Sequence, residues 1–336
     1  MGKAVHVGVV GLGRIGRLHA EAIATGKVKN ARLIGVSDIV EPLARNISKR
    51  LNVDYYTSFD SMLKDSRIDA VIIATPTYLH KEQIIQSLEA GKHVFVEKPM
   101  TVSSEEAEEV VKAVEKMKLK LQVGYMRRFD EQYRRAKSII KEGGIGKTIA
   151  FVNIARDPEA PPGWASDPKL SGGIFLDMLS HDFDMACWLL SSEIKEVFVY
   201  GGNYIYEEIG RKGDLDVVSV LFRFVNNAQG FIHGARKSVF GYELKTEIYG
   251  DKGTIYIGSP YENLFAVGRK DGILFEGLKW FEKRFYDAYT RELNHFITSI
   301  IEDKRPEVNE HDGYRAVKIG EACWKSFQEH EKVEVL

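Results

Sequence analysis

The sequence is poor in cysteine: its 336 residues include two, Cys187 and Cys323. They lie far apart and belong to no Cys-x-x-Cys or Cys/His spacing, which argues against a disulfide framework and against a structural zinc site. We expect both thiols to be buried as small apolar side chains.

The chain also lacks a charge excess and a long apolar run. Its 47 Lys and Arg residues nearly balance 48 Asp and Glu, for a net charge of -1. It therefore has no basic field to hold nucleic acid or an anionic membrane. No segment approaches the roughly 18 uninterrupted apolar residues of a membrane span, and the N-terminus lacks a signal-peptide layout. We expect a cytoplasmic protein with neither nucleic acid nor membrane as partner.

The length and the order of patterns predict an α/β protein of two domains. Strand and helix patterns alternate up to residue 123, as in a Rossmann doubly wound parallel sheet. From residue 124 the pattern changes to an α+β domain with a large mixed or antiparallel sheet. The expected domains are 1–123 and 124–336, with the last helix a candidate to pack back on the first domain. The expected elements of the second domain are helices 131–141, 174–190, 282–302 and 312–330, and strands 148–155, 194–206, 215–225, 228–235, 243–249 and 254–257.

A glycine motif follows the first strand pattern, residues 5–10. Gly11-Leu12-Gly13-Arg14-Ile15-Gly16 has the spacing of a dinucleotide-binding fingerprint. Gly11 allows the tight turn, Gly13 lets the backbone approach a pyrophosphate, and Gly16 lets the following helix pack closely on the sheet. The N-terminus of that helix presents free N–H groups to the phosphates. A purely structural turn is the competing interpretation, which the surrounding strand, helix and acid disfavour.

Asp38 is that acid, and it ends the next apolar segment, roughly twenty residues past the glycines. A carboxylate there accepts the ribose hydroxyls of NAD and repels the 2′-phosphate of NADP. No arginine stands at position 39 or 40 to bind that phosphate. The sequence predicts NAD as the cofactor, with NADP disfavoured.

Lys98 follows another strand pattern, in Glu97-Lys98-Pro99. Ligands of open parallel sheets bind outside the carboxyl ends of the strands. The proline restricts the backbone of Lys98 and so gives it a set direction. An ordinary solvated lysine is the alternative interpretation.

Asp177, His181 and Asp184 form a polar stripe on the otherwise apolar helix expected at 174–190. Spacings of four and three residues would place them on one helical face. A carboxylate beside an imidazole fixes its tautomer and supports the cation that forms when it takes a proton. Acid–base catalysis is thus one interpretation, and a structural histidine is another. Metal ligation by the same three side chains is a third, disfavoured because no Cys or further His lies nearby.

Five motifs together resemble the Gfo/Idh/MocA oxidoreductases, over almost the whole chain. They are the glycines at 11–16, Ala74-Thr75-Pro76 with His80, Glu97-Lys98-Pro99, the run from Gly124 to Asp130, and Gly-Gly-x-x-x-Asp-x-x-x-His-Asp at 172–182. The segments 127–130, 171–188 and Gly241-Tyr242 are most similar to the inositol 2-dehydrogenase subgroup.

The resemblance implies roles for individual residues. His181 would be the general base on the carbinol hydroxyl, Asp177 would orient and polarise it, and Lys98 would hydrogen-bond the same oxygen. The cofactor contacts that it implies are Gly11, Gly13, Arg14, Ile15, Gly16, Asp38, Ala74, Thr75, Pro76, His80, Glu97 and Lys98. The implied substrate contacts are Lys98, Arg127, Asp157, Asp177, His181, Asp184 and Tyr242.

The resemblance further implies NAD-dependent oxidation of a secondary hydroxyl of a cyclic polyol, myo-inositol first, and a homo-oligomer, tetramer or dimer, built on the outer face of the large sheet. A pyranose dehydrogenase, acting on glucose or a related aldose, is the nearest alternative. An NAD-dependent glycosidase and a non-catalytic regulator are further ones. Thr77 and the loop 157–169 with Trp164 depart from the family pattern, which leaves the substrate open.

Overall fold

The computed structural model describes residues 4–161, 163–258, 266–270, 272–275 and 278–335. By packing, the chain divides into two compact units. Unit 1 comprises Met1–Phe129 and Asp287–Val317, and unit 2 comprises Asp130–Tyr286 and Lys318–Leu336. The domain boundary at residues 123/124 stays a prediction. The packing groups residues 287–317 with the first unit.

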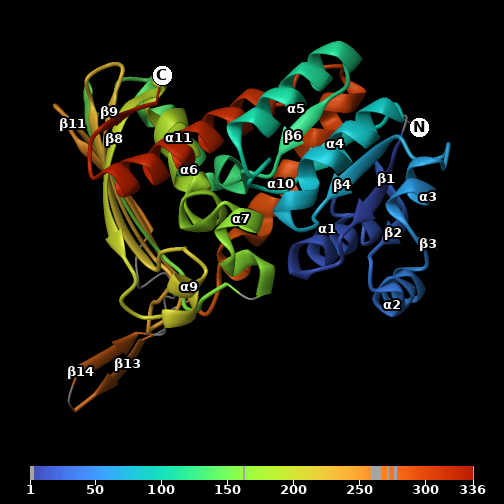
Figure 1. Cartoon of the computed structure of the whole chain (residues 1–336), viewed down its shortest axis with the longest axis horizontal. Coiled ribbons are helices and arrows are strands. Elements are labelled where there is room, and N and C mark those ends of the chain that lie inside the picture. The colour runs from blue at the N-terminus through green and yellow to red at the C-terminus, as the bar shows by residue number, and fades with distance from the viewer. Residues whose placement is uncertain (1–3, 162, 259–265, 271, 276–277, 336) are drawn as a thin grey trace. The chain divides into compact units, whose positions relative to one another are not determined.

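Unit 1 contains a six-stranded parallel sheet in the order β3-β2-β1-β4-β5-β6, the strand order of a Rossmann fold (Figure 1). Short, almost wholly apolar strands such as Ala70–Ile73 are typical of a parallel sheet covered on both faces. Its elements are β1 Val5–Val10, α1 Arg14–Ala24, β2 Ala31–Ser37, α2 Glu41–Leu51, β3 Asp54–Tyr56, α3 Phe59–Leu63, β4 Ala70–Ile73, η1 Thr77–Leu79, α4 His80–Glu89, β5 His93–Val96, α5 Ser104–Met117, β6 Leu121–Val123 and η2 Met126–Phe129.

The core of unit 1 combines segments far apart in the sequence. Val9 of β1, Val36 of β2 and Phe95 of β5 pack with Leu293 and Phe296. The last two come from α10, Phe281–Ile301, which belongs to unit 1 from Asp287 onward. The next helix, α11 Glu310–Glu329, begins in unit 1 and ends in unit 2.

Unit 2 contains a seven-stranded mixed sheet in the order β12-β11-β7-β10-β9-β8-β15. The β7–β10 pair is parallel and the other pairs are antiparallel. Together with the parallel sheet of unit 1, this confirms the predicted fold class. The elements of unit 2 are α6 Glu131–Lys141, β7 Thr148–Arg156, η3 Gly163–Ser166, α7 Pro168–Ser171, η4 Ile174–Met178, α8 Ser180–Leu190, β8 Ile194–Gly202, α9 Glu207–Arg211, β9 Val217–Phe224, β10 Gln229–Ala235, β11 Glu243–Gly250, β12 Thr254–Ile257, β13 Ala266–Arg269, β14 Gly272–Phe275 and β15 Val333–Glu334.

Several smaller expectations can be compared with the structure. Cys187 and Cys323 are both buried, as predicted. The long helix expected at 174–190 is wrong in part, because a π-helical turn, η4, occupies 174–178 and α8 begins at Ser180. Strands end earlier than expected where polar loops follow, as β8 does at Gly202. None of the helices in the described ranges has the length and apolar character of a membrane span.

Candidate active site

The glycine turn of unit 1 has the geometry that its spacing predicts. Gly11 has a φ of +84°, and a Cβ there would lie 2.5 Å from the carbonyl oxygen of Ala74. A Cβ on Gly16 would lie 1.8 Å from the carbonyl oxygen of Gly11, whereas a Cβ on Gly13 would meet nothing within 4 Å. The first and third glycines thus pack against protein, and the second leaves open the space that a pyrophosphate needs.

Asp38 lies directly after β2 and is tied to this turn. Its Oδ2 accepts a hydrogen bond from the N–H of Leu12 at 2.6 Å, and its Oδ1 accepts one from Val40 at 2.8 Å. Because each carboxylate oxygen has two acceptor sites, the half-buried carboxylate keeps capacity for ribose hydroxyls. The residues therefore fit a dinucleotide at the carboxyl ends of β1 and β2.

His80 joins the segments that follow β4 and β5. Its Nδ1 lies 2.9 Å from the carbonyl oxygen of Pro99, and its Nε2 lies 2.9 Å from that of Thr75. Burial lowers the pKa of His80, against the opposing effect of these two carbonyl groups. Backbone carbonyl groups contact the ring on both sides, so the geometry supports a role in holding these two loops in place. The cofactor contact of His80 stays a prediction from the sequence.

Glu97 and Lys98 follow β5 with different surroundings. The Glu97 carboxylate lies 2.7 Å from Nε2 of His19, a buried residue of α1. Lys98 is half-buried. The predicted cofactor contacts of unit 1, from the glycines to Lys98, therefore all lie at the carboxyl end of the parallel sheet or in the helix start beside it.

In unit 2, two glycines with a positive φ precede the segment that carries Asp177 and His181. Gly172 and Gly173 have φ values of +78° and +66°. The turn η4 closes through a wide hydrogen bond in which the N–H of Leu179 donates to the carbonyl of Ile174 at 3.0 Å. Asp177 lies in this π-helical turn, while His181 and Asp184 lie in α8. The regular helical spacing expected from Asp177 to His181 is therefore interrupted between them.

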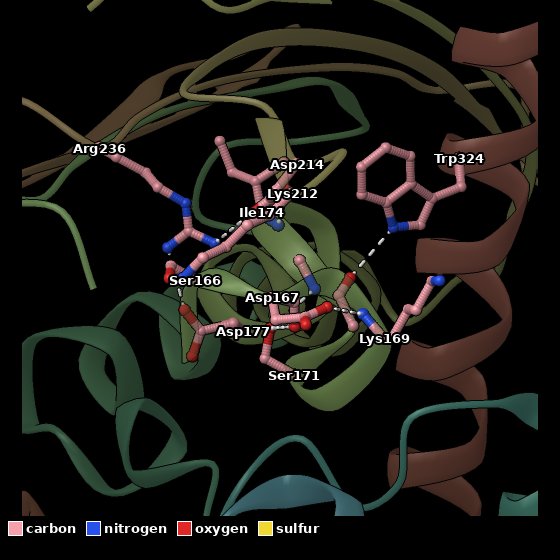
Figure 2. Close-up of polar contacts among 12 residues, drawn as sticks. Ser166, Asp167, Lys169, Ser171, Ile174, Asp177, Lys212, Asp214, Arg236 and Trp324 are labelled. Atoms are coloured by element: carbon pink, nitrogen blue, oxygen red, sulfur yellow. Dashed lines mark hydrogen bonds and ion pairs between the residues drawn. The ribbon is translucent and has the colours of Figure 1, made fainter. Parts of the chain in front are cut away.

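Arg236, which is not among the residues predicted from the sequence, forms an ion pair with Asp177. Its side chain is fully buried, with Nη1 3.0 Å from Asp177 Oδ2 and Nη2 2.9 Å from Asp214 Oδ2 (Figure 2). Burial lowers the pKa of Arg236, but the charges of Asp177 and Asp214 outweigh it and raise that pKa above its usual value. Its position directly after strand β10, where a charged side chain follows a strand pattern, is the signal that could have identified it.

Asp214 links this ion pair to the turn at Gly172 and Gly173. Its Oδ1 accepts a hydrogen bond from the N–H of Ile174 at 2.9 Å. On the other side, Trp324 of α11 donates from Nε1 to the carbonyl of Gly172 at 3.0 Å. A chain of polar contacts thus fixes the segment that carries Asp177.

The four further substrate residues predicted from the sequence have distinct places. Asp157 follows β7, and its N–H donates to the carbonyl of Ala235 at 3.0 Å, so it lies beside the strand end that carries Arg236. Asp184 is buried in α8. Tyr242 is buried against Trp280 and Phe281, with ring centroids 6.4 and 6.1 Å away. Arg127 lies buried in η2 of unit 1. The other three belong to unit 2, as do Asp177 and His181.

Comparison with known proteins decides the family. The model described as an oxidoreductase family with an NAD-binding Rossmann fold matches residues 5–125, and that of the GFO/IDH/MocA C-terminal domain matches residues 133–256. The chain belongs to the Gfo/Idh/MocA oxidoreductase family. It is therefore an NAD-dependent oxidoreductase, which confirms the predicted enzyme class and cofactor.

Full-length relatives share about a third of their residues with this family member. A myo-inositol 2-dehydrogenase of Thermotoga maritima is 35% identical, with 98% of each chain covered. A scyllo-inositol 2-dehydrogenase (NAD(+)) of Bacillus subtilis is 36% identical over 98% of this chain and 95% of the relative. A crystal structure of scyllo-inositol dehydrogenase from Lactobacillus casei, with bound NAD(H) and scyllo-inositol, matches with a TM-score of 0.92, 33% identity and 99% of each chain covered.

Proposed function

We propose that this oxidoreductase oxidises one secondary hydroxyl of a cyclic polyol, myo-inositol, to the ketone and reduces NAD. The observation that carries the proposal is its full-length similarity to inositol 2-dehydrogenases at 35% and 36% identity. The acid–imidazole segment of unit 2 supports it, because a buried Arg236 holds Asp177 four residues before His181.

The proposed roles follow from the chemistry of each side chain. His181 takes the hydroxyl proton as general base, and Asp177 orients that hydroxyl and stabilises the imidazolium. Lys98 donates a hydrogen bond to the same oxygen. NAD, when bound, supplies the hydride acceptor. The turn at Gly11–Gly16, together with Asp38, holds NAD. The remaining substrate hydroxyls are bound by Arg127, Asp157, Asp184 and Tyr242.

A second candidate is scyllo-inositol, favoured by the Bacillus subtilis and Lactobacillus casei relatives. Oxidation of myo-inositol at its axial hydroxyl and of scyllo-inositol at any carbon yields the same ketone. The reverse reaction therefore separates the two: NADH is added to that ketone, and the product is resolved by chromatography or NMR. Hydride delivery to the face that leaves an axial hydroxyl gives myo-inositol, as we propose. Formation of scyllo-inositol alone would assign the other epimer.

The same proposal is tested in the forward direction by NADH absorbance. We expect NADH to accumulate with free inositols, and less with glucose, related aldoses or inositol phosphates. Aglycone release from a chromogenic glycoside without NADH would instead indicate a glycosidase. NAD binding with no turnover on any substrate of the panel would indicate a regulator.

We also propose that the chain forms a homo-oligomer through the outer face of the seven-stranded sheet. Phe198, Leu221, Phe231 and Val152 are successive cross-strand partners, so they share one face. Leu221 is 51% exposed in the single chain. Light scattering is expected to show a tetramer or dimer, and Leu221→Glu should shift it toward the monomer. A wild-type monomer would contradict the proposal.

A further inference from the structure

Three ionisable side chains meet in the interior of unit 1, behind the strand end that carries Lys98. They are His19 of α1, Glu97 after β5 and Glu292 of α10, and one donor atom of each lies within 4.8 Å of those of the other two. His19 and Glu292 are fully buried, and the Glu97 side chain is 12% exposed. The predicted cofactor contacts account for Glu97 only.

Glu292 is the unusual member of this cluster. Among the described residues, neither carboxylate oxygen has a hydrogen-bond partner and neither takes part in an ion pair. Apolar and aromatic groups surround the cluster: the His19 ring packs edge-on against Phe95 and Tyr289, with centroids 5.3 and 5.9 Å away. A buried carboxylate without a cation is strongly destabilised, so it takes up a proton or binds a metal ion.

The geometry favours the proton. His19 Nε2 lies 2.7 Å from Glu97 Oε1, a hydrogen-bond length, and because a carboxylate can only accept, the imidazole is assigned as the donor. Two donor atoms of a tetrahedral zinc ion stay roughly 3.3 Å apart, since each lies about 2.0 Å from the metal. Two of the three groups therefore satisfy each other directly, which leaves Glu292 as the group that has to be neutralised.

We propose that Glu292 is a neutral carboxylic acid beside the Glu97 carboxylate, and that its neutrality keeps Glu97, and the chain from Glu97 into Lys98, in place. Glu292 is then a positioning residue, and only its effect on Lys98 rests on the proposed function. Glu97 has little room to move, because a Cβ on Gly124 would already lie 2.9 Å from its Oε2. A second negative charge would push Glu97 against this wall or away from His19.

The direction of the pKa supports the geometry. Burial, and next the charge of Glu97, raise the pKa of Glu292 well above its ordinary value. The titratable groups that face it are Glu97 from the end of β5 and His19 from α1. The neighbouring β6 contributes Gln122, whose Nε2 donates to the Glu292 backbone carbonyl at 2.9 Å.

The first experiment uses the apoprotein and does not involve activity. Glu292→Gln imitates the protonated acid in shape and charge. Infrared difference spectra between wild type and this variant are expected to show one protonated-carboxyl stretch, lost in the variant. Because the folded-state pKa is raised, the stabilisation from the proton is complete below the unfolded pKa and is lost as pH rises through the folded pKa. Folding at neutral pH should therefore take up about one proton fewer in Glu292→Gln.

Glu310→Gln is the matched control. Glu310 is also a buried glutamate of unit 1, but Arg305 donates to its Oε1 from Nη2 at 2.6 Å. Its replacement should remove no protonated-carboxyl band and no proton uptake on folding. Loss of the same signals in both variants would overturn the assignment to Glu292.

The second experiment tests positioning through the reaction. In Glu292→Gln the alkaline limb of the kcat profile should move to higher pH, because the amide has no proton to lose, while kcat at neutral pH should stay close to that of wild type. A pH profile identical in wild type and Glu292→Gln would overturn the positioning role.

Metal analysis distinguishes a bound metal ion from a neutral carboxylic acid at Glu292. A stoichiometric divalent ion in the purified protein, lost in Glu292→Gln, with no protonated-carboxyl band in wild type, would overturn the neutral acid. An infrared band with no dehydrogenase activity on any polyol would instead contradict the proposed function and leave the neutral acid supported.

Discussion

The Arg236 guanidinium lies 3.0 Å from the Asp177 carboxylate, with which it forms an ion pair. The same guanidinium bonds Asp214, which accepts the N–H of Ile174 at the start of the π-helical turn. One buried cation therefore fixes both the candidate catalytic carboxylate and the backbone that carries it. The contribution of this contact to the free energy of unfolding can be measured without an activity assay.

Replacing Arg236 with Met should destabilise the protein by about 3 kcal/mol, because it leaves the fully buried Asp214 without its cation. Asp214→Asn in the same chain should recover part of the loss. Denaturant unfolding measures both. Arg211→Met, which removes an exposed pair with Glu207, should leave unfolding unchanged. An equal loss in the two arginine variants would contradict the special role of Arg236.

Gly173→Ala should destabilise unit 2 more than Gly213→Ala. Both glycines have a positive φ, so alanine is strained by about 1 kcal/mol or more at either position. Only at Gly173 would the new Cβ also clash, 2.6 Å from Asp214 Oδ1, while nothing lies within 4 Å at Gly213. Unfolding midpoints of the two variants measure the difference. Equal midpoints would show that the turn can relax.

His181→Ala should reduce kcat by roughly 10² to 10⁴, the usual contribution of a general base, while NADH fluorescence titration shows unchanged cofactor binding. Lys98→Ala is expected to lower kcat by orders of magnitude in the same way, with NAD still bound. Lys112→Ala, which removes an exposed pair with Glu108, is the control and should keep full activity. Retained turnover in either site variant would contradict the assigned roles.

Two substitutions of Asp38 separate the effect of its charge on cofactor choice from the effect of its hydrogen bond to Leu12. Asp38→Asn keeps an oxygen to accept the N–H of Leu12 but removes the charge, so the preference for NAD over NADP should narrow. Asp38→Ala should also loosen the glycine turn and weaken both cofactors. The ratio of kcat/KM values for NAD and NADP measures the preference. An unchanged ratio in both variants would rule out the ribose assignment.

Local patterns predicted much of unit 1 because each element there has its own signal. Ser103, for example, caps α5 through a local contact, because its hydroxyl accepts the N–H of Glu106 at 3.3 Å. The glycine spacing and Asp38 likewise describe short-range geometry. In contrast, no local pattern indicates the interruption at Leu179. The apolar residues on both sides fit a continuous helix, and the π-helical turn depends on glycines held by distant groups.

The sequence by itself determined the order of elements, the nucleotide turn and the family, since these depend on residues close together along the chain. Only the tertiary structure decided that α10 completes the core of unit 1, that Arg236 holds Asp177, and that Glu292 lies against Glu97. Glu97 and Glu292, like Asp177 and Arg236, are far apart in sequence. Their pairing depends on which strands and helices pack together, and no local spacing encodes that packing.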